Sequence, residues 1–270
     1  MTIPTTQGYR RHVPAFQLRF FGHSTVLVTI DGVRILTDPV LGGIGPLRHH
    51  APTRGHGALS ADVIVVSHGH RDHLDLPSLH AVGGEPLIVV PAGLGQLCRR
   101  AGLHRVEEVV SGDLVDAGEG VTLRAFPALH DGGRPPMGPR TEAIGFVFEG
   151  SSHVYFAGDT DVFPQMGSLR GTLDLALMPV WGWGPNLGPG HMDPGRAAEA
   201  VALLRPRVAV PVHWGGLFPR GMHHVWPHLL VEPPREFARH VREAGTATEV
   251  CILKPGESMV VEPRPDQPAI

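Results

Sequence analysis

Residues 64–75 read IVVSHGHRDHLD. An apolar, β-branched run ends at Val66, and three histidines and two aspartates follow it directly. Such a run is typical of a buried β-strand. Imidazole and carboxylate groups are common ligands of zinc and of other divalent ions. The stretch therefore predicts a strand that delivers metal-binding side chains at its carboxyl end.

The spacing within this stretch indicates how the side chains could share metal ions. In extended backbone, residues two apart project to the same face, so we expect His68 and His70 to bind one ion. Asp72 and His73 follow as the chain turns toward a helix, and we expect them to point at a neighbouring position. Two ligand pairs this close predict two ions rather than one. The alternative is a polar loop with chance histidines, which the spacing disfavours.

Further ligands are expected where other predicted strands end. His130 closes FPALHD, Asp159 lies in YFAGDTD and His213 lies in VPVHWG. A strand end suits a reactive residue because the sheet holds its backbone rigid while the side chain faces a cleft. Taken alone, Asp159 would be an ordinary turn aspartate. It becomes a candidate ligand only because it lies in order between His130 and His213 in the series of strand-end residues. The histidines expected to be ordinary surface or core residues are His12, His49, His50, His56, His104, His223, His224, His228 and His240.

The rest of the chain alternates strands and helices. Strands are expected at 16–22, 24–30, 33–38, 61–67, 85–91, 173–180, 208–214, 249–256 and 258–262, with a strand–turn–strand unit over 106–130 and a hairpin over 142–161. Helices are expected at 76–83, 93–103, 195–205 and 234–245, and loops at 42–60 and 181–194. In each half strands come first and helices follow. This order predicts two sheets packed face to face with helices outside them, in one α/β domain over residues 1–270.

Composition excludes several classes of protein. The net charge is −3 and the basic residues are scattered, which argues against nucleic acid as a partner. No apolar run approaches the roughly 20 residues that span a bilayer, and the N-terminus lacks an apolar signal region. The two cysteines form no CxxC unit, so we expect a reducing, cytoplasmic location. The sequence leaves the oligomeric state open, and a homo-oligomer fits it.

The ordered motifs resemble those of one known superfamily. H-x-H-x-D-H at 68–73, followed by His130, Asp159 and His213, resembles the metallo-β-lactamase superfamily of metal-dependent hydrolases. The resemblance covers nearly the whole chain. It implies a four-layer αββα sandwich with the site at one sheet edge, in agreement with the position of the ligands at strand ends.

Three shorter segments narrow the resemblance. GHSTVLV at 22–28, GHMDP at 190–194 and PVHWG at 211–215 are similar to two groups within the superfamily. One group is the ascorbate-6-phosphate lactonase-like proteins, and the other is the phospholipase D-like enzymes that hydrolyse N-acyl-phosphatidylethanolamine. The resemblance therefore implies a small-molecule substrate with an ester-type bond, either a lactone or a phosphodiester.

The resemblance also implies how the ligands divide. It assigns His68, His70 and His130 to one ion, Asp72, His73 and His213 to the other, and Asp159 to a bridge between them. The ions are expected to be zinc, although manganese and iron also suit these donors. Two such ions lower the pKa of a shared water, so the nucleophile is expected to be a bridging hydroxide.

Two residues are predicted to take part in the chemistry besides binding metal. Asp72 is expected to orient the hydroxide as well as to ligate. His191, in the Gly-rich GPNLGPGHMDP, is predicted to donate a proton to the leaving group or to contact the oxyanion. The alternative for His191 is a structural place just before a helix that Asp193 caps. His23 is predicted to orient a ligand or Asp38 rather than to bind metal itself. The resemblance implies that Asp38 supports the ligands from behind.

Substrate contacts are predicted on two loops. Trp181 and Trp183 could form an aromatic wall, although packing on the core is the expected role of at least one of them. Arg134 could pair with a phosphate or carboxylate, and an exposed loop arginine is the alternative. Residues 214–230 are apolar enough for a membrane-facing patch, but the basic cluster expected near anionic lipid is missing.

Other functions of the same scaffold remain as alternatives. A metal-dependent nuclease would need a basic stripe, which the sequence lacks. A di-iron redox protein of this superfamily would carry glutamate in place of His70 and a fused flavin domain. A non-catalytic metal-binding scaffold would be expected to have lost ligands, and all seven predicted ligands are present. A β-lactamase proper would be expected to carry other ligands in place of Asp72 and His73.

Overall fold

The computed structural model describes residues 16–49, 59–134 and 138–262 of the 270-residue chain. The predictions for His12, His50 and His56, for the N-terminal segment and for the 50–58 part of the expected loop lie outside these ranges. Within them, no helix is both long enough and apolar enough to cross a bilayer.

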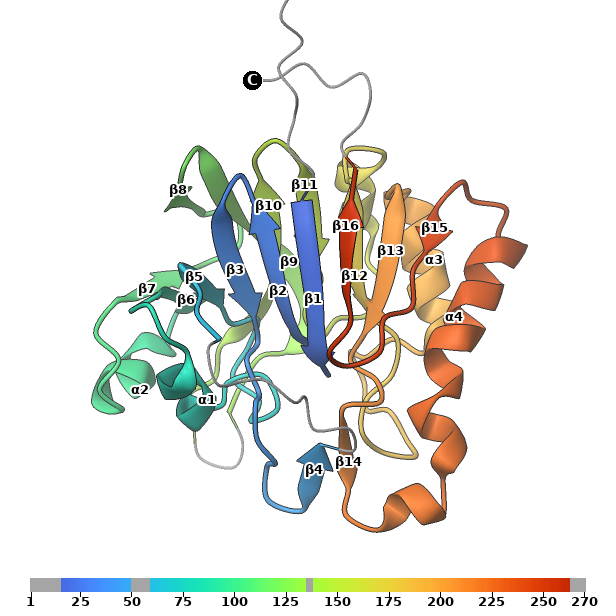
Figure 1. The fold of residues 1–270 in the computed structure, drawn as a ribbon, viewed down its shortest axis with the longest axis horizontal. Coiled ribbons are helices and arrows are strands. Elements are labelled where there is room, and N and C mark those ends of the chain that lie inside the picture. Colours follow the sequence, from blue (N-terminus) through green and yellow to red (C-terminus); the bar gives the residue numbers. More distant parts are fainter. Residues whose placement is uncertain (1–15, 50–58, 135–137, 263–270) are drawn as a thin grey trace, which may run out of the picture.

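Two seven-stranded sheets dominate the described residues (Figure 1). The first sheet has the order β16-β1-β2-β3-β5-β6-β7. Its strands are β16 (Ser258–Val261), β1 (Phe16–Gly22), β2 (Thr25–Ile30), β3 (Val33–Thr37), β5 (Val63–Val65), β6 (Leu87–Pro91) and β7 (Val106–Val109). Strands β2 and β3 form the predicted hairpin, with Ile30 opposite Val33. Its turn residues have positive φ, 51° at Asp31 and 88° at Gly32, as a type I′ turn requires.

The second sheet has the order β15-β13-β12-β11-β10-β9-β8. Its strands are β15 (Glu249–Val250), β13 (Val208–Val212), β12 (Leu175–Pro179), β11 (His153–Phe156), β10 (Glu142–Glu149), β9 (Val121–Asp131) and β8 (Leu114–Gly118). A small separate sheet joins β4 (Leu47–His49) to β14 (Leu217–Pro219) below the two large ones (Figure 1).

Helices cover the outer faces of both sheets. They are α1 (Leu76–Ala81), α2 (Gly95–Arg100), α3 (Pro194–Leu204) and α4 (Glu232–Glu243), with 3₁₀ segments η2 (Pro164–Leu169), η3 (Met222–His224) and η4 (Pro227–Leu230). Helix α3 begins as predicted, because the Asp193 carboxylate accepts the backbone N–H of Arg196 at 2.8 Å and Pro194 occupies the first turn.

Successive side chains of a strand point to opposite faces of its sheet, and the hydrophobic core is divided accordingly. Val28 of β2 and Phe146 of β10 belong to the large cluster between the sheets, which continues to Phe237 of α4. The opposite face of the first sheet presents Ile64, which belongs to a second cluster with Cys98 of α2. Two sheets with helices on both outer faces confirm the predicted α/β sandwich.

Several predicted elements differ from the observed ones. The strands expected at 61–67 and 249–256 are shorter, and β4 lies in an expected loop. The region 106–130 contains three strands rather than two, because the chain crosses from the first sheet to the second at a turn before β8. In this turn Gly112 has φ 99° and the Asp113 carboxylate accepts the backbone N–H of Val110. The Ser111–Gly112 pair was a signal for the turn but not for the change of sheet.

Candidate metal centre

The predicted ligands meet because parallel strands end at a common edge. Strands β11, β12 and β13 run parallel, so Asp159, Trp181 and His213 follow their carboxyl ends on the same side of the second sheet. In the first sheet β3 and β5 are also parallel, and Asp38 and His68 follow them. Side chains from the two edges meet, since His73 Nε2 of the first sheet's edge lies 3.1 Å from Asp159 Oδ2 of the second sheet's edge.

The 68–73 segment reaches this edge as a loop of bends and turns rather than as extended strand. The reasoning that placed His68 and His70 on one strand face was therefore wrong in its geometry, although their rings do meet, with centroids 4.6 Å apart. Gly69 between them donates its N–H to Gly132 O at 2.8 Å. A Cβ at Gly69 would lie 2.9 Å from that oxygen, so the close approach of the two loops requires glycine here.

Three histidines form the first ligand group. His68, His70 and His130 each present a ring nitrogen, and these atoms lie within 4.8 Å of one another. His130 Nε2 is 3.2 Å from His70 Nδ1. His130 comes from the end of β9, so the group joins the two sheets.

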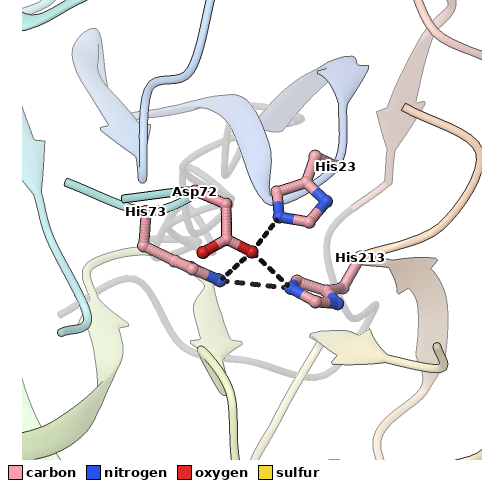
Figure 2. A group of neighbouring side chains, drawn as sticks. All are labelled: His23, Asp72, His73 and His213. Atoms are coloured by element: carbon pink, nitrogen blue, oxygen red, sulfur yellow. Dashed lines mark hydrogen bonds and ion pairs between the residues drawn. The ribbon is translucent and has the colours of Figure 1, made fainter. Parts of the chain in front are cut away.

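The second group contains one carboxylate and three histidines. The donor atoms of His23, Asp72, His73 and His213 also lie within 4.8 Å of one another. Figure 2 shows these side chains pointing toward one another. His73 Nε2 lies 3.1 Å from His213 Nε2, and Asp72 Oδ2 lies 3.8 Å from each of them. Three of these four residues belong to the predicted ligand set, and His23 is the addition.

Asp159 lies between the two groups. Its Oδ2 is 3.1 Å from His73 Nε2 and 3.9 Å from His68 Nε2, and its Oδ1 is 3.3 Å from His213 Nε2. The carboxylate is nearly fully buried. It therefore contacts residues of both groups, as a bridging ligand would.

Four of the histidines share one pattern: Nδ1 has a partner, and Nε2 faces the centre. The Nδ1 partners are Ser67 Oγ for His68 (2.9 Å), Asp38 Oδ2 for His73 (2.6 Å), Gly190 O for His130 (3.0 Å) and Trp181 O for His213 (2.6 Å). The carboxylate and the two carbonyls only accept, and the Ser67 hydroxyl already donates its one proton to Asp38 Oδ2. These contacts therefore assign the proton to Nδ1 and leave a lone pair on Nε2. Metal-binding histidines are held in this way.

The arrangement fits a bound cation. Facing lone pairs on His73 Nε2 and His213 Nε2, 3.1 Å apart, repel each other unless a positive charge lies between them. His68 Nε2 is buried and, among the described residues, has no hydrogen-bond partner. In the same part of the chain, the ion-pair partners of Asp72 and Asp159 are all histidines. The site thus has buried negative charge and unused nitrogen lone pairs, the donor set of divalent metal ions.

Burial keeps most of these imidazoles neutral. It lowers the pKa of His130 to about 4 and, together with nearby His213, that of His23 to about 3. Burial also lowers the pKa of His68 well below its usual value. His73 differs from these three: burial opposes its protonation, but the surrounding carboxylates, led by Asp159, raise its pKa well above the usual value. A site that attracts a proton this strongly also attracts a metal ion.

The 181–193 loop carries two further predicted residues to the site. Trp183 is 41% exposed, and its indole N–H donates to Asp72 Oδ2 at 3.1 Å. His191 Nε2 lies 3.3 Å from Asp159 Oδ2, and its Nδ1 is 3.1 Å from Gly188 O. His191 is therefore near the centre and partly open to solvent, two residues before the capping Asp193.

Two predicted substrate residues occupy other places. Trp181 packs against the core, and its indole donates to Gly184 O at 3.1 Å, so the expected wall of two tryptophans is reduced to Trp183. Arg134 Nη1 donates to Gly69 O at 3.0 Å and to Leu74 O at 2.8 Å, near the two ends of the 68–73 loop. This nitrogen fixes the loop, which the prediction of a substrate contact did not foresee.

Some residues that shape the site were not predicted. Ser67 donates its backbone N–H to Asp38 Oδ1 at 2.7 Å and its hydroxyl to Asp38 Oδ2 at 2.6 Å. Its position directly before His68 was an available signal. The carbonyls of Gly190 and Trp181 had none, because a backbone oxygen has the same chemistry in every residue.

Comparison with known proteins assigns the family. Residues 33–214 match the beta-lactamase superfamily domain. A UPF0173 metal-dependent hydrolase of Methanopyrus kandleri is 33% identical over 258 residues, which cover 90% of this chain and 98% of that protein. The chain therefore belongs to the metallo-β-lactamase superfamily.

Two other relatives add detail. N-acyl-phosphatidylethanolamine-hydrolyzing phospholipase D 1 of Caenorhabditis elegans is 32% identical over 75% of this chain and 64% of its own length. The solved structure of Igni18, a metallo hydrolase of Ignicoccus hospitalis, has a TM-score of 0.69 and 25% identity, and covers 93% of this chain and all of its own. The match spans only 60% of the length of mycobacterial relatives that are 35% identical.

Proposed function

We propose that this protein is a dinuclear metal-dependent hydrolase that cleaves an ester-type bond, a lactone or a phosphodiester, in a small molecule. One observation carries the proposal. Two groups of inward-facing donors lie on either side of one buried carboxylate, Asp159, whose oxygens are 3.1–3.9 Å from nitrogens of both groups. The metal-dependent hydrolases among the relatives support the same reaction class.

The proposed ligand sets follow the two groups. His68, His70 and His130 would hold one ion, Asp72, His73 and His213 the other, and Asp159 would bridge them. Two divalent ions in these positions would acidify a bound water and polarise the carbonyl or phosphoryl oxygen of the substrate. Nitrogen and carboxylate donors suit zinc, and also manganese or iron.

The chain's own residues orient this chemistry. Asp38 and Ser67 hold His73 and His68 from behind, so their Nε2 atoms point at the centre without rearrangement. Asp72, on the same loop, is positioned to orient the attacking water as well as to ligate. His191 Nε2, 3.3 Å from Asp159, is partly exposed and could pass a proton to the departing oxygen. Burial opposes protonation of His191, but the Asp159 carboxylate raises its pKa, which favours the acid form.

The surroundings of the centre fit a small substrate. Trp183 presents an exposed aromatic face beside Asp72, suited to an apolar or sugar-like group. The relative from Caenorhabditis elegans, named for hydrolysing a phosphodiester of a lipid, supports the phosphodiester form of the proposal. Both cysteines, Cys98 and Cys251, are free thiols, which fits a reducing cytoplasm.

The first experiment is metal content by elemental analysis of protein purified without added metal. About two equivalents of zinc, manganese or iron per chain would support the dinuclear proposal. A single equivalent that cannot be increased by reconstitution would contradict it. The loaded protein would then be offered lactones and bis(p-nitrophenyl) phosphate. Turnover that a chelator removes and metal restores is the expected result, and no turnover of either class would overturn the ester-type assignment.

A further inference from the structure

The β1–β2 turn aims one histidine into the metal centre. His23 has a left-handed backbone, with φ 54°, a conformation that residues other than glycine adopt only with strain. Asp38 (φ 34°) and His213 (φ 60°) share this region, so three of the strained positions border one site. Strain of this kind persists where the surroundings enforce it, often at functional sites.

Neighbouring backbone holds His23 in this conformation. Its carbonyl accepts the N–H of His213 at 2.7 Å, which ties the turn to the residue after β13. Gly216 packs so closely that a Cβ there would lie 2.5 Å from His23 N. The turn is therefore held on both sides, and the His23 side chain points toward the centre (Figure 2).

The side chain meets one functional group there. His23 is fully buried, and its Nε2 lies 3.2 Å from Asp72 Oδ2. A carboxylate accepts but does not donate, so this contact requires the imidazole proton on Nε2. Its Nδ1 is buried and has no hydrogen-bond partner among the described residues, which fits a nitrogen that carries no proton. Asp72 Oδ2 also accepts the exposed Trp183 indole N–H, at 3.1 Å.

We infer that His23 is a positioning residue for the second metal: its Nε2–H fixes the Asp72 carboxylate, with weaker help from Trp183. This inference rests on the proposed function, because Asp72 is a ligand only if the centre binds metal. The sequence predicted that His23 orients a ligand or Asp38, and the structure identifies Asp72 as the residue that His23 contacts.

A direct ligand role for His23 is the alternative that geometry disfavours. Asp72, His73, His213 and the bridging Asp159 already supply four protein donors to the second ion. A catalytic site keeps a coordination position open for water or substrate, and a fifth protein ligand would fill it. As a hydrogen-bond donor behind Asp72, His23 leaves that position free and orients the carboxylate.

The test compares two variants that are unbranched at Cβ and so bear the same backbone strain. His23→Leu removes the donor, and His23→Gln places an amide N–H near the position of Nε2. Metal-free protein is titrated with zinc against a chromophoric chelator, with circular dichroism as a check on folding. We expect His23→Leu to weaken one of the two zinc equivalents by about 10- to 100-fold and to leave the other unchanged, and His23→Gln to stay within about threefold of wild type.

The opposite results would overturn the inference. These are wild-type affinity for both ions in His23→Leu, or a loss in His23→Gln as large as in His23→Leu, which would indicate that the imidazole itself binds metal. If His23→Leu does not fold, long-range ¹H–¹⁵N spectra of the zinc-loaded wild type decide: a protonated Nε2 supports the inference, and a metal-bound Nε2 contradicts it. The metal content and turnover of the wild type test the proposed function separately.

Discussion

Replacing Asp159 by asparagine should empty both metal positions while leaving the fold intact. The substitution keeps the shape of the side chain and removes its charge. That charge is buried and lies 3.1 Å from His73 Nε2 and 3.3 Å from His213 Nε2. Because the carboxylate also contacts the first group through His68, its loss should affect both ions.

The magnitude follows from the burial of this charge. Removing one partner from a buried charged pair costs about 3–5 kcal/mol. Since about 1.4 kcal/mol corresponds to a tenfold change, the dissociation constant of each ion should rise by roughly a hundredfold to a few thousandfold. Turnover should fall with metal content, because water activation depends on both ions.

The assay is a zinc titration of metal-free protein against a chromophoric chelator, followed by elemental analysis after gel filtration. Asp161→Asn is the matched control, because Asp161 lies two residues further on and pairs with Arg196 at 2.8 Å rather than with the centre. The control should keep wild-type metal content. If Asp159→Asn retained both ions within about threefold of wild-type affinity, Asp159 would not be the bridge.

Three other predictions concern residues around the centre and in the core. His191→Ala should lower turnover by about a hundredfold and keep the metals; elemental analysis beside kcat checks this, and loss of metal would make His191 a ligand. Arg134→Met should lower the free energy of unfolding by about 1–3 kcal/mol, because Gly69 O and Leu74 O lose their donor; an unchanged thermal midpoint of the metal-free protein would refute this role. Burial raises the pKa of Cys98 to about 11, so at pH 8 almost no thiolate forms. Iodoacetamide should therefore alkylate the partly exposed Cys251 first and Cys98 only in denaturant, which peptide mass spectrometry would show.

Local patterns in the sequence were sufficient for much of the fold. The β-branched run before Ser67 predicted a buried strand, and the Asp31–Gly32 pair predicted the hairpin turn, because both depend on conformational preferences of adjacent residues. The sequence did not predict that the chain changes from the first sheet to the second at the turn before β8. A turn signal indicates that the chain reverses, but not which sheet receives the next strand, since pairing depends on distant residues.

For the candidate site too, the sequence predicts some features and only the tertiary structure decides the others. The sequence by itself was sufficient to predict candidate metal ligands, because His68, Asp159 and His213 follow recognisable strand ends. Only the tertiary structure decided how they are held. The carbonyls of Gly190 and Trp181 orient His130 and His213 across 60 and 32 residues of chain, and a backbone oxygen carries no residue identity. The contact between His23 and Asp72 likewise spans 49 residues, so it exists only after strands β1, β2, β3 and β5 of the first sheet have assembled.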